Sequence, residues 1–383
     1  MHPSLCETST FQFDLLHRSK KSRARVGRIY TPHGCIDTPG FVAVGTNGTL
    51  KALDNASVNA LGVQLMFCNT YHMMLQPGTE VVRAAGGLHT FIHRSGPIIT
   101  DSGGFQVFSL AYGSVADELK GKGKRKSEGS VLKITEDGVL FRSYRDGKKI
   151  WLTPESSIAA QKDLGADIII PFDELPPYHI DPSSLRRSLE RTHRWEERSL
   201  LAHLKNPQNQ AMYAVIHGGV DLQMRKESCD FLTSRPFDGF AIGGSLGKTK
   251  EEMITMLKET VPRLPEDKPN HLLGIGDLYS IDRCIPLGID TFDSSYPTRS
   301  ARHGIALTSR GPLNLTKTQY ASSFEPLDPE CECPTCRRYS LAYVHHLFKA
   351  HETPGMTLAS IHNLHFMVEL MQRYRQNILD DLV

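Results

Sequence analysis

Acidic residues and paired glycines follow several short apolar runs of this sequence. Asp101 follows one run, Asp173 follows a second, and Asp293 ends a third. Glycine pairs stand at comparable places, Gly103-Gly104 and Gly243-Gly244. A single acid after a strand is usually the cap of the next helix, but three acids beside glycine pairs indicate a site. Two facing carboxylates suit glycosidic chemistry, because one can attack the anomeric carbon while the other handles the proton of the leaving group.

A second chemically active group lies near the C-terminus, where Cys331, Cys333 and Cys336 fall within six residues in the spacing C-x-C-x-x-C. No export signal precedes them, so the crowding indicates metal binding rather than disulfides. Three thiolates and one imidazole make a closed structural zinc site. We therefore expect one structural Zn²⁺ per subunit. The spacing does not choose among the histidines of the tail, which are His345, His346, His351, His362 and His365.

The elements that must position these residues alternate between short apolar runs and helix-length amphipathic segments. At least seven such βα units in about 250 residues predict an α/β fold, a (β/α)8 TIM barrel, with a doubly wound open sheet as the alternative. In a barrel the strand ends share one face, where active sites are built. The runs span 63–67, 97–100, 167–171, 212–216, 239–242, 271–274 and 289–292, and the expected helices span 154–164, 182–204, 222–233, 250–261 and 280–287.

Three parts of the chain are predicted from these patterns. Strand-like segments at 11–16 and 25–30 indicate an N-terminal β-sheet cap over residues 1–40. The barrel then spans 41–325, and a zinc-binding subdomain with C-terminal helices at 338–351 and 356–378 spans 326–383. A stretch with five cations at 120–126 reads as a solvated basic loop or as a phosphate contact.

Composition sets limits on the class of protein. The chain has 383 residues, of which 39% are hydrophobic, so global disorder is excluded. The 44 basic and 42 acidic residues give a net charge of +2, so any nucleic-acid binding must come from local clustering. We see neither an apolar run long enough to cross a bilayer nor a secretory signal, and we expect a cytoplasmic protein without a membrane partner.

The chain resembles tRNA-guanine transglycosylases, also called queuine tRNA-ribosyltransferases, over nearly its whole length. The resemblance implies a TIM barrel with an inserted zinc subdomain and a homodimer. It also implies exchange of guanine at wobble position 34 of tRNAs with GUN anticodons (Asp, Asn, His, Tyr) for a free 7-deazaguanine base. The motifs that carry it are CNTYH at 68–72, TDSGGFQ at 100–106, FDE at 172–174, FD at 292–293 with PTR at 297–299, and the cysteine tail ending in IHN at 361–363.

The resemblance also implies roles for individual residues. Asp293 matches the nucleophile and Asp101 the general acid/base, in a covalent double displacement. His362 matches the fourth zinc ligand beside the three cysteines. Residues that match the tRNA-binding segment are Gly274, Thr298, Arg299 and Arg302. Residues that match the base pocket are Ser102, Gly103, Gly104, Phe105, Asp173, His217, Gly243, Gly244, Gly247 and Leu273, with Asp173 and the Gly244 backbone binding the guanine-like edge.

The sequence departs from the bacterial pattern of this family at His217 and across Ser245-Leu246-Gly247-Lys248, where that pattern has leucine, alanine, valine and glycine. His217 stands where that pattern has glutamine, which leaves the contact with the base edge open. Gly247 stands where it has valine, and the eukaryotic branch, which accepts queuine, also has glycine there. We therefore expect queuine rather than 7-aminomethyl-7-deazaguanine as the incoming base, unless Leu175 or Leu246 refills the space.

Two other classes of protein remain as alternatives at this point. A non-catalytic, zinc-stabilised RNA-binding subunit would explain the cysteines and the basic stretch, but not two retained acids, Asp101 and Asp293. A glycoside hydrolase on the same barrel would explain the acids but not the arginines that match the tRNA segment.

Overall fold

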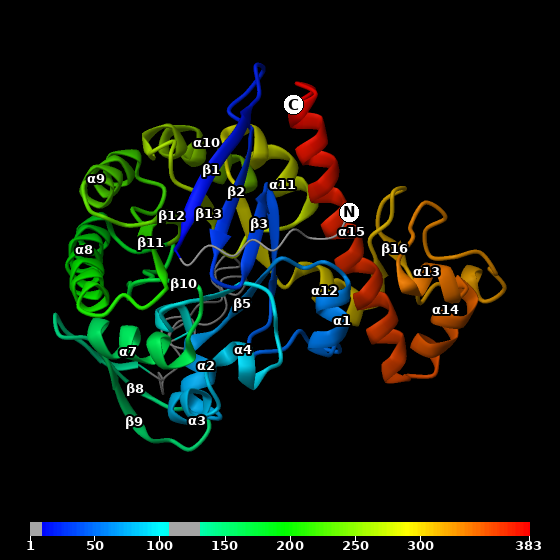
Figure 1. The fold of residues 1–383 in the computed structure, drawn as a ribbon, viewed down its shortest axis with the longest axis horizontal. Coiled ribbons are helices and arrows are strands. Elements are labelled where there is room, and N and C mark those ends of the chain that lie inside the picture. The colour runs from blue at the N-terminus through cyan, green and yellow to red at the C-terminus, as the bar shows by residue number, and fades with distance from the viewer. Residues whose placement is uncertain (1–9, 107–130) are drawn as a thin grey trace.

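The structure of the chain is a computed structural model that describes residues 10–106 and 131–383 (Figure 1). The basic stretch at 120–126 lies outside the described residues, so the phosphate contact stays a prediction.

Eight parallel strands close into a barrel in the spatial order β10, β11, β12, β13, β14, β4, β5, β6. This confirms the predicted TIM barrel. Most strand residues are buried, as expected for strands covered on both faces. The seven apolar runs match seven of the strands, and the eighth, β4, starts where the alternating pattern begins. The strands are β4 (Gly40–Val44), β5 (Leu65–Cys68), β6 (Ile98–Thr100), β10 (Ile168–Ile169), β11 (Ala211–Ile216), β12 (Gly239–Ile242), β13 (Asn270–Leu272) and β14 (Thr291–Ser294).

Helices follow most of the strands and cover the outside of the barrel. The side chains of Thr153, Asp181 and Asp221 accept hydrogen bonds from the first turns of three of these helices, which fixes where they begin. The outer helices are α7 (Pro154–Leu164), α8 (Pro182–Leu204), α9 (Leu222–Thr233), α10 (Lys250–Thr260) and α11 (Leu278–Cys284), and shorter ones are α1 (Asn55–Ala60), α2 (Thr70–Leu75), α3 (Thr79–Ala84) and α4 (Leu88–Phe91).

An antiparallel sheet of β1 (Gln12–Arg18), β2 (Arg25–Thr31) and β3 (Gly34–Thr38) lies against the barrel (Figure 1). The Arg25 guanidinium donates two hydrogen bonds, of 2.9 and 2.6 Å, to the carboxylate of Asp290, just before β14. The sheet therefore contacts the end of the barrel at which the strands begin, opposite the end that carries the predicted site.

A second antiparallel sheet stands between β6 and α7, and the sequence did not predict it. Its strands are β7 (Val131–Ile134), β8 (Val139–Arg142) and β9 (Lys149–Leu152). Each has only four residues, of which one is an exposed charged residue (Lys133, Arg142 or Lys149), so its apolar pattern is weak. Its buried residues pack in one cluster with Tyr71 and Trp195.

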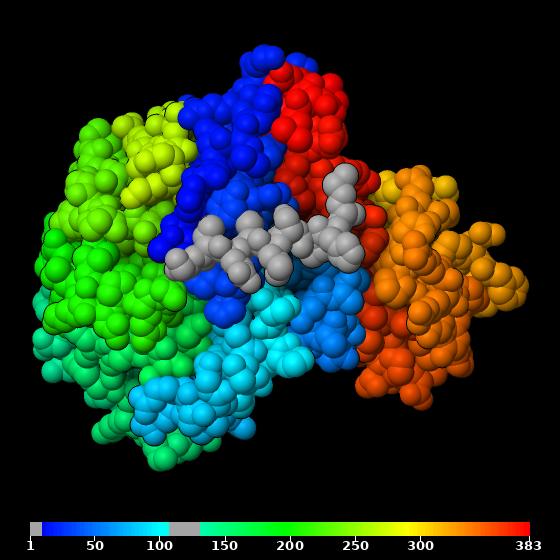
Figure 2. All heavy atoms as spheres, in the orientation of Figure 1, coloured from blue at the N-terminus to red at the C-terminus, as the bar shows by residue number. Residues whose placement is uncertain are grey.

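The C-terminal lobe projects from one side of the barrel (Figure 2). It contains β15 (Ile305–Ala306), β16 (Leu313–Asn314), α13 (Pro334–Arg338) and α14 (Leu341–Lys349). The long helix α15 (Thr353–Leu379) packs against α13 and α14 and also against α12 (Tyr296–Arg302) and β4. One helix thus joins the lobe to the barrel, and the three-part division of the chain stays a prediction.

Among the described residues, no helix has the length and apolar character that crossing a membrane requires.

Candidate active site and metal centre

The predicted site residues lie at the carboxyl ends of consecutive barrel strands. Parallel strands of a barrel run in one direction, so these ends form one mouth. Asp101 directly follows β6, while Asp293 belongs to β14, and β4 and β5 stand between these two strands in the barrel order. The other strand-end residues at this mouth are Asp173 after β10, His217 after β11, Gly243 and Gly244 after β12, and Leu273 and Gly274 after β13.

Asp101 is buried and receives hydrogen bonds on both carboxylate oxygens. The Asn69 side-chain amide donates to Oδ2 at 2.5 Å, and the Thr70 backbone N–H donates to Oδ1 at 2.7 Å. The Gln106 amide donates to Oδ2 at 2.9 Å. Burial raises the pKa of Asp101 to about 6, although these hydrogen bonds oppose the rise. A carboxyl group with this pKa can give and take a proton near neutral pH.

The carboxylate of Asp293 is held through its Oδ1 atom. The Gly274 backbone N–H donates to its Oδ1 at 2.7 Å, and Nε2 of His271 lies 3.1 Å from the same atom. Nδ1 of His271 in turn lies 2.8 Å from the hydroxyl of Thr291. Within 10–106 and 131–383, Oδ2 of Asp293 has no hydrogen-bond partner in the structure. The contacts with Gly274 and His271 thus orient the carboxylate through Oδ1.

Asp173 forms a neighbouring wall of the mouth and is held from two sides. The Ser102 hydroxyl donates to its Oδ1 at 2.9 Å, and Nε2 of His217 lies 3.0 Å from its Oδ2. His217 is buried, so its ring cannot turn away without displacing its neighbours. The histidine that departs from the bacterial pattern therefore lies against Asp173.

Two of the predicted glycines allow close approach of the backbone to this wall. A Cβ at Gly104 would lie 2.6 Å from the carbonyl oxygen of Asp173. Gly244 has a φ of +75°, and a Cβ there would lie 2.9 Å from Nδ1 of His217. Any larger residue at either position would displace Asp173 or His217.

The backbone conformation at residue 247 favours glycine, whatever the role of this residue in the base pocket. Its φ is +111°, and a Cβ would lie 3.0 Å from Oε2 of Glu252. The same carboxylate accepts a hydrogen bond from the Lys248 N–H and lies 3.1 Å from the Tyr178 hydroxyl. A valine here would therefore be strained as well as bulky.

The remaining pocket positions differ in exposure. Phe105 is 46% exposed, although Asp101, four residues earlier, is buried. Leu273 is half-buried, with its Cδ1 3.1 Å from where a Cβ of Gly243 would be. Gly103 has a φ of +82° at the turn that follows Asp101.

The predicted RNA-binding residues lie on α12 and in the loop after β13. Arg299 and Gly274 are exposed and Arg302 is half-buried. Burial, followed by the charge of Arg299, lowers the pKa of Arg302. Thr298 is buried and its hydroxyl donates to the Ser295 carbonyl, and its contact with RNA stays a prediction.

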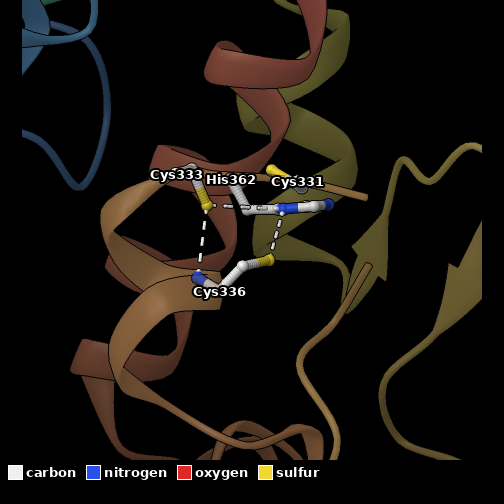
Figure 3. Close-up of side chains that lie close together, drawn as sticks. All are labelled: Cys331, Cys333, Cys336 and His362. Carbon is white, nitrogen blue, oxygen red and sulfur yellow. Dashed lines mark hydrogen bonds between the residues drawn. The ribbon is translucent and has the colours of Figure 1, made fainter. Parts of the chain in front are cut away.

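The cysteine cluster meets a histidine of α15 inside the C-terminal lobe (Figure 3). The sulfur atoms of Cys331, Cys333 and Cys336 and a ring nitrogen of His362 all lie within 4.8 Å of one another, and all four residues are buried. Hydrogen bonding with Cys331 and Cys336 lowers the pKa of the Cys333 thiol, which favours a thiolate. Three thiols and one imidazole form the donor set of a closed structural zinc site.

The second nitrogen of His362 fixes the tautomer that the metal needs. Nε2 lies 2.7 Å from the Leu307 carbonyl oxygen, which can only accept a hydrogen bond, so Nε2 carries the proton. Nδ1 is then unprotonated, and it lies 3.3 Å from the Cys336 sulfur and 3.6 Å from the Cys333 sulfur. The four residues therefore fit one Zn²⁺ ion, held through Nδ1 and three sulfurs.

A protein-family profile described as Queuine tRNA-ribosyltransferase matches residues 19–383. The chain belongs to this family. A queuine tRNA-ribosyltransferase of Protochlamydia amoebophila (strain UWE25) is 72% identical over 373 residues, covering 97% of this chain and 96% of the relative. Relatives of the same name from Chlamydia abortus (strain DSM 27085 / S26/3) and Chlamydia trachomatis serovar D (strain ATCC VR-885 / DSM 19411 / UW-3/Cx) are 57% and 54% identical, each covering 97% of this chain and 99% of the relative.

Membership in the queuine tRNA-ribosyltransferase family confirms the resemblance that the motifs indicated. It also confirms the prediction of an enzyme, and the class is that of the pentosyltransferases. The buried cluster of Cys331, Cys333, Cys336 and His362 is consistent with a zinc site in this family.

Three residues of this site carried no role in the sequence interpretation. Asn69 and Gln106 belong to two of the family motifs. In the structure both side-chain amides donate hydrogen bonds to Asp101 and so help to orient its carboxyl group. His271 stands in an apolar run, where a lone histidine usually belongs to the core, and nothing in the spacing linked it to Asp293. Only the pairing of β13 with β14, with His271 opposite Thr291, shows that link.

Removing one metal ligand should destabilise the lobe. We expect His362→Ala to lose bound zinc and to lower the apparent Tm by more than about 5 °C, because a structural metal contributes folding free energy directly. Zinc content per chain and differential scanning calorimetry check this. His365→Ala is the matched control, since His365 lies on the same helix with its Nδ1 3.6 Å from the Cys331 sulfur. Loss of zinc in the control but not in His362→Ala would contradict the assignment.

Proposed function

We propose that this enzyme exchanges guanine at wobble position 34 of tRNAs with GUN anticodons for a free 7-deazaguanine base, by a covalent double displacement. The observation that carries the proposal is the contrast between two carboxylates at one barrel mouth. Asp101 is buried with a raised pKa, whereas Asp293 is oriented through one oxygen and offers the other. The first environment suits proton transfer and the second suits attack on carbon.

In the first half of the reaction, Oδ2 of Asp293 attacks C1′ of the ribose of guanosine 34. The C1′–N9 bond breaks, and guanine leaves with a proton that Asp101 donates. The tRNA is then bonded to the enzyme through C1′ and Oδ2. The donors on Oδ1, Gly274 and His271, stay in place throughout and hold the carboxylate in its attacking orientation.

In the second half, the incoming base gives its N9 proton to Asp101, and N9 attacks C1′. The C1′–Oδ2 bond breaks, which releases the modified tRNA and regenerates both acids. Two displacements at one carbon retain its configuration. The base at position 34 must leave its stack to reach the mouth, and the exposed Arg299, with Arg302 on the same helix, supplies positive charge for the phosphates.

The wall formed by Asp173, Ser102 and His217 is suited to hold the base edge. A carboxylate accepts hydrogen bonds from the amide and amino groups of a guanine-like ring. Ser102 and His217 fix both oxygens of Asp173, so the acceptor is in place before the base arrives. The Gly244 backbone lies close to His217, and its peptide groups are available to hydrogen-bond the base edge.

Three further features belong to the proposal. They are a homodimeric assembly, a cytoplasmic location and a structural role for one zinc ion per subunit. The zinc site lies in the C-terminal lobe and has four protein ligands, which leave no coordination position for a substrate.

We propose queuine as the incoming base. Support comes from Gly247, which lacks a side chain where the bacterial pattern of the family has valine. Wild-type enzyme should show a kcat/KM at least about tenfold higher for queuine than for 7-aminomethyl-7-deazaguanine, since a pocket that accommodates added bulk gains apolar contact from it. Parallel incorporation of both labelled bases into one GUN-anticodon tRNA measures the ratio.

The same assay tests the function as a whole. A tRNA carrying adenine at position 34 is the control, and it should incorporate neither base. A clear preference for the aminomethyl base would contradict the queuine proposal, and no incorporation of either base would contradict the exchange reaction itself.

A further inference from the structure

Two histidines and a buried aspartate meet at the end of the barrel opposite the candidate active site. His33 belongs to the turn between β2 and β3, and His89 belongs to α4. Asp167 directly precedes β10, where the barrel strands begin. Three segments far apart in the sequence thus bring one ligand-type group each to one point.

The carboxylate of Asp167 is fixed before either histidine is considered. It is fully buried, and the Ile98 backbone N–H donates to its Oδ2 at 2.8 Å. Burial alone would raise its pKa, but hydrogen bonds from His33 and His89 outweigh burial and lower the pKa to about 2. The group is therefore a carboxylate throughout the physiological range.

The two imidazole rings contact different oxygens of this carboxylate. Nδ1 of His33 lies 2.7 Å from Oδ1, and Nε2 of His89 lies 3.1 Å from Oδ2. The rings stack, with centroids 3.5 Å apart and planes 11° from parallel. Both nitrogens consequently face the same side, and the three ligand atoms all lie within 4.8 Å of one another.

We propose that His33, His89 and Asp167 form a second metal site, which binds a divalent transition-metal ion of the zinc type. Two imidazole nitrogens and one carboxylate oxygen suit zinc, cobalt or nickel better than magnesium or calcium. Bonds of about 2.1 Å in a tetrahedral site place ligand atoms about 3.4 Å apart. With Oδ1 as the ligand oxygen, its 2.7 Å distance from Nδ1 of His33 needs to widen by less than about 1 Å, and Nε2 of His89 already lies within 4.8 Å of both atoms.

The site differs from the cysteine centre in its access. The His33 side chain is 41% exposed, so solvent can supply the remaining ligands and the ion can exchange. A bound ion would tie the β2–β3 turn and α4 to the start of β10. The geometry points to a stabilising clamp between the N-terminal sheet and the barrel, separate from the base-exchange chemistry.

Cobalt binding to the full chain tests this proposal. Protein loaded with one zinc per chain is titrated with Co²⁺ at pH 7.5, with equilibrium dialysis and visible absorption as readouts. We expect a second equivalent without the near-ultraviolet thiolate-to-cobalt band that exchange into the cysteine centre would produce. His33→Gln and His89→Gln should each weaken this binding by at least about tenfold while leaving base exchange unchanged.

His17→Gln is the matched control, because His17 also pairs with an aspartate, Asp381 at 3.2 Å, and no metal-type cluster of the described residues includes it. This variant should bind cobalt as wild type does. Absence of a second equivalent in wild type, its persistence in both site variants, or its loss in the control would each overturn the proposal.

Discussion

Asp293→Asn should abolish base exchange, with a loss of at least about 10⁴-fold in kcat, because removal of a covalent nucleophile leaves only binding and proton transfer. Asparagine keeps an oxygen for the Gly274 N–H, so the fold and the binding of tRNA should be preserved. Single-turnover release of labelled guanine measures the rate. A denaturing gel measures the adduct between enzyme and tRNA, which the variant should not form.

Asp146→Asn is a suitable control, since Asp146 lies on an exposed loop between β8 and β9. It should keep wild-type exchange and wild-type adduct. If Asp293→Asn still formed a denaturation-resistant adduct, another group would be the nucleophile, and the assignment of both carboxylates would have to be abandoned.

Asp101→Asn should slow the release of guanine by about 10²- to 10⁴-fold, as loss of a general acid does. The wild-type rate of this half-reaction should also fall as pH rises through about 6, because the protonated fraction of Asp101 then decreases. The variant should lack this dependence. Asp238→Asn is the matched control, a carboxyl group whose pKa burial also raises but which precedes β12 at the opposite end of the barrel.

The same residue links stability to pH. The pKa of Asp101 in the folded chain lies above its ordinary 3.8, so its stabilising contribution is complete below that value and is lost as pH rises through about 6. The full difference corresponds to about 3 kcal/mol. The free energy of unfolding should therefore fall less between pH 4 and pH 7 in Asp101→Asn than in wild type. Identical slopes and an unchanged rate profile would show that Asp101 does not titrate in this range.

Much of the fold could be predicted because the barrel strands and helices follow local rules. Helices α7, α8 and α9 begin and end where the amphipathic pattern predicts, and the structure adds the caps Thr153, Asp181 and Asp221. The expected helices at 250–261 and 280–287 end in short 3-10 turns, Val261–Arg263 and Ile285–Leu287. The β7–β9 sheet escaped prediction because its strands are short and half solvent-facing, so neither length nor alternation marked them.

The sequence could predict which acids share the mouth of the barrel, because the ends of parallel strands lie together. Any parallel barrel brings Asp101, Asp173 and Asp293 to one mouth, whereas the partners of these acids depend on strand register. The link from His271 to Asp293 requires β13 beside β14, and the link from His217 to Asp173 requires the β11 end to lie near the β10 loop. Sequence spacing contains neither relation.

Helix α15 has a consequence for how the molecule could be divided. Its His362 end reaches the cysteine cluster, while the Arg375 guanidinium donates to the Pro39 carbonyl and the last residue, Val383, accepts from Ser19. Removing the lobe together with α15 would therefore expose the part of the barrel that α15 covers. It would also remove the hydrogen bonds to Pro39 and Ser19, which lie next to the N-terminal sheet. We therefore expect the lobe with the cysteine cluster to fold together with the barrel rather than as a separate module.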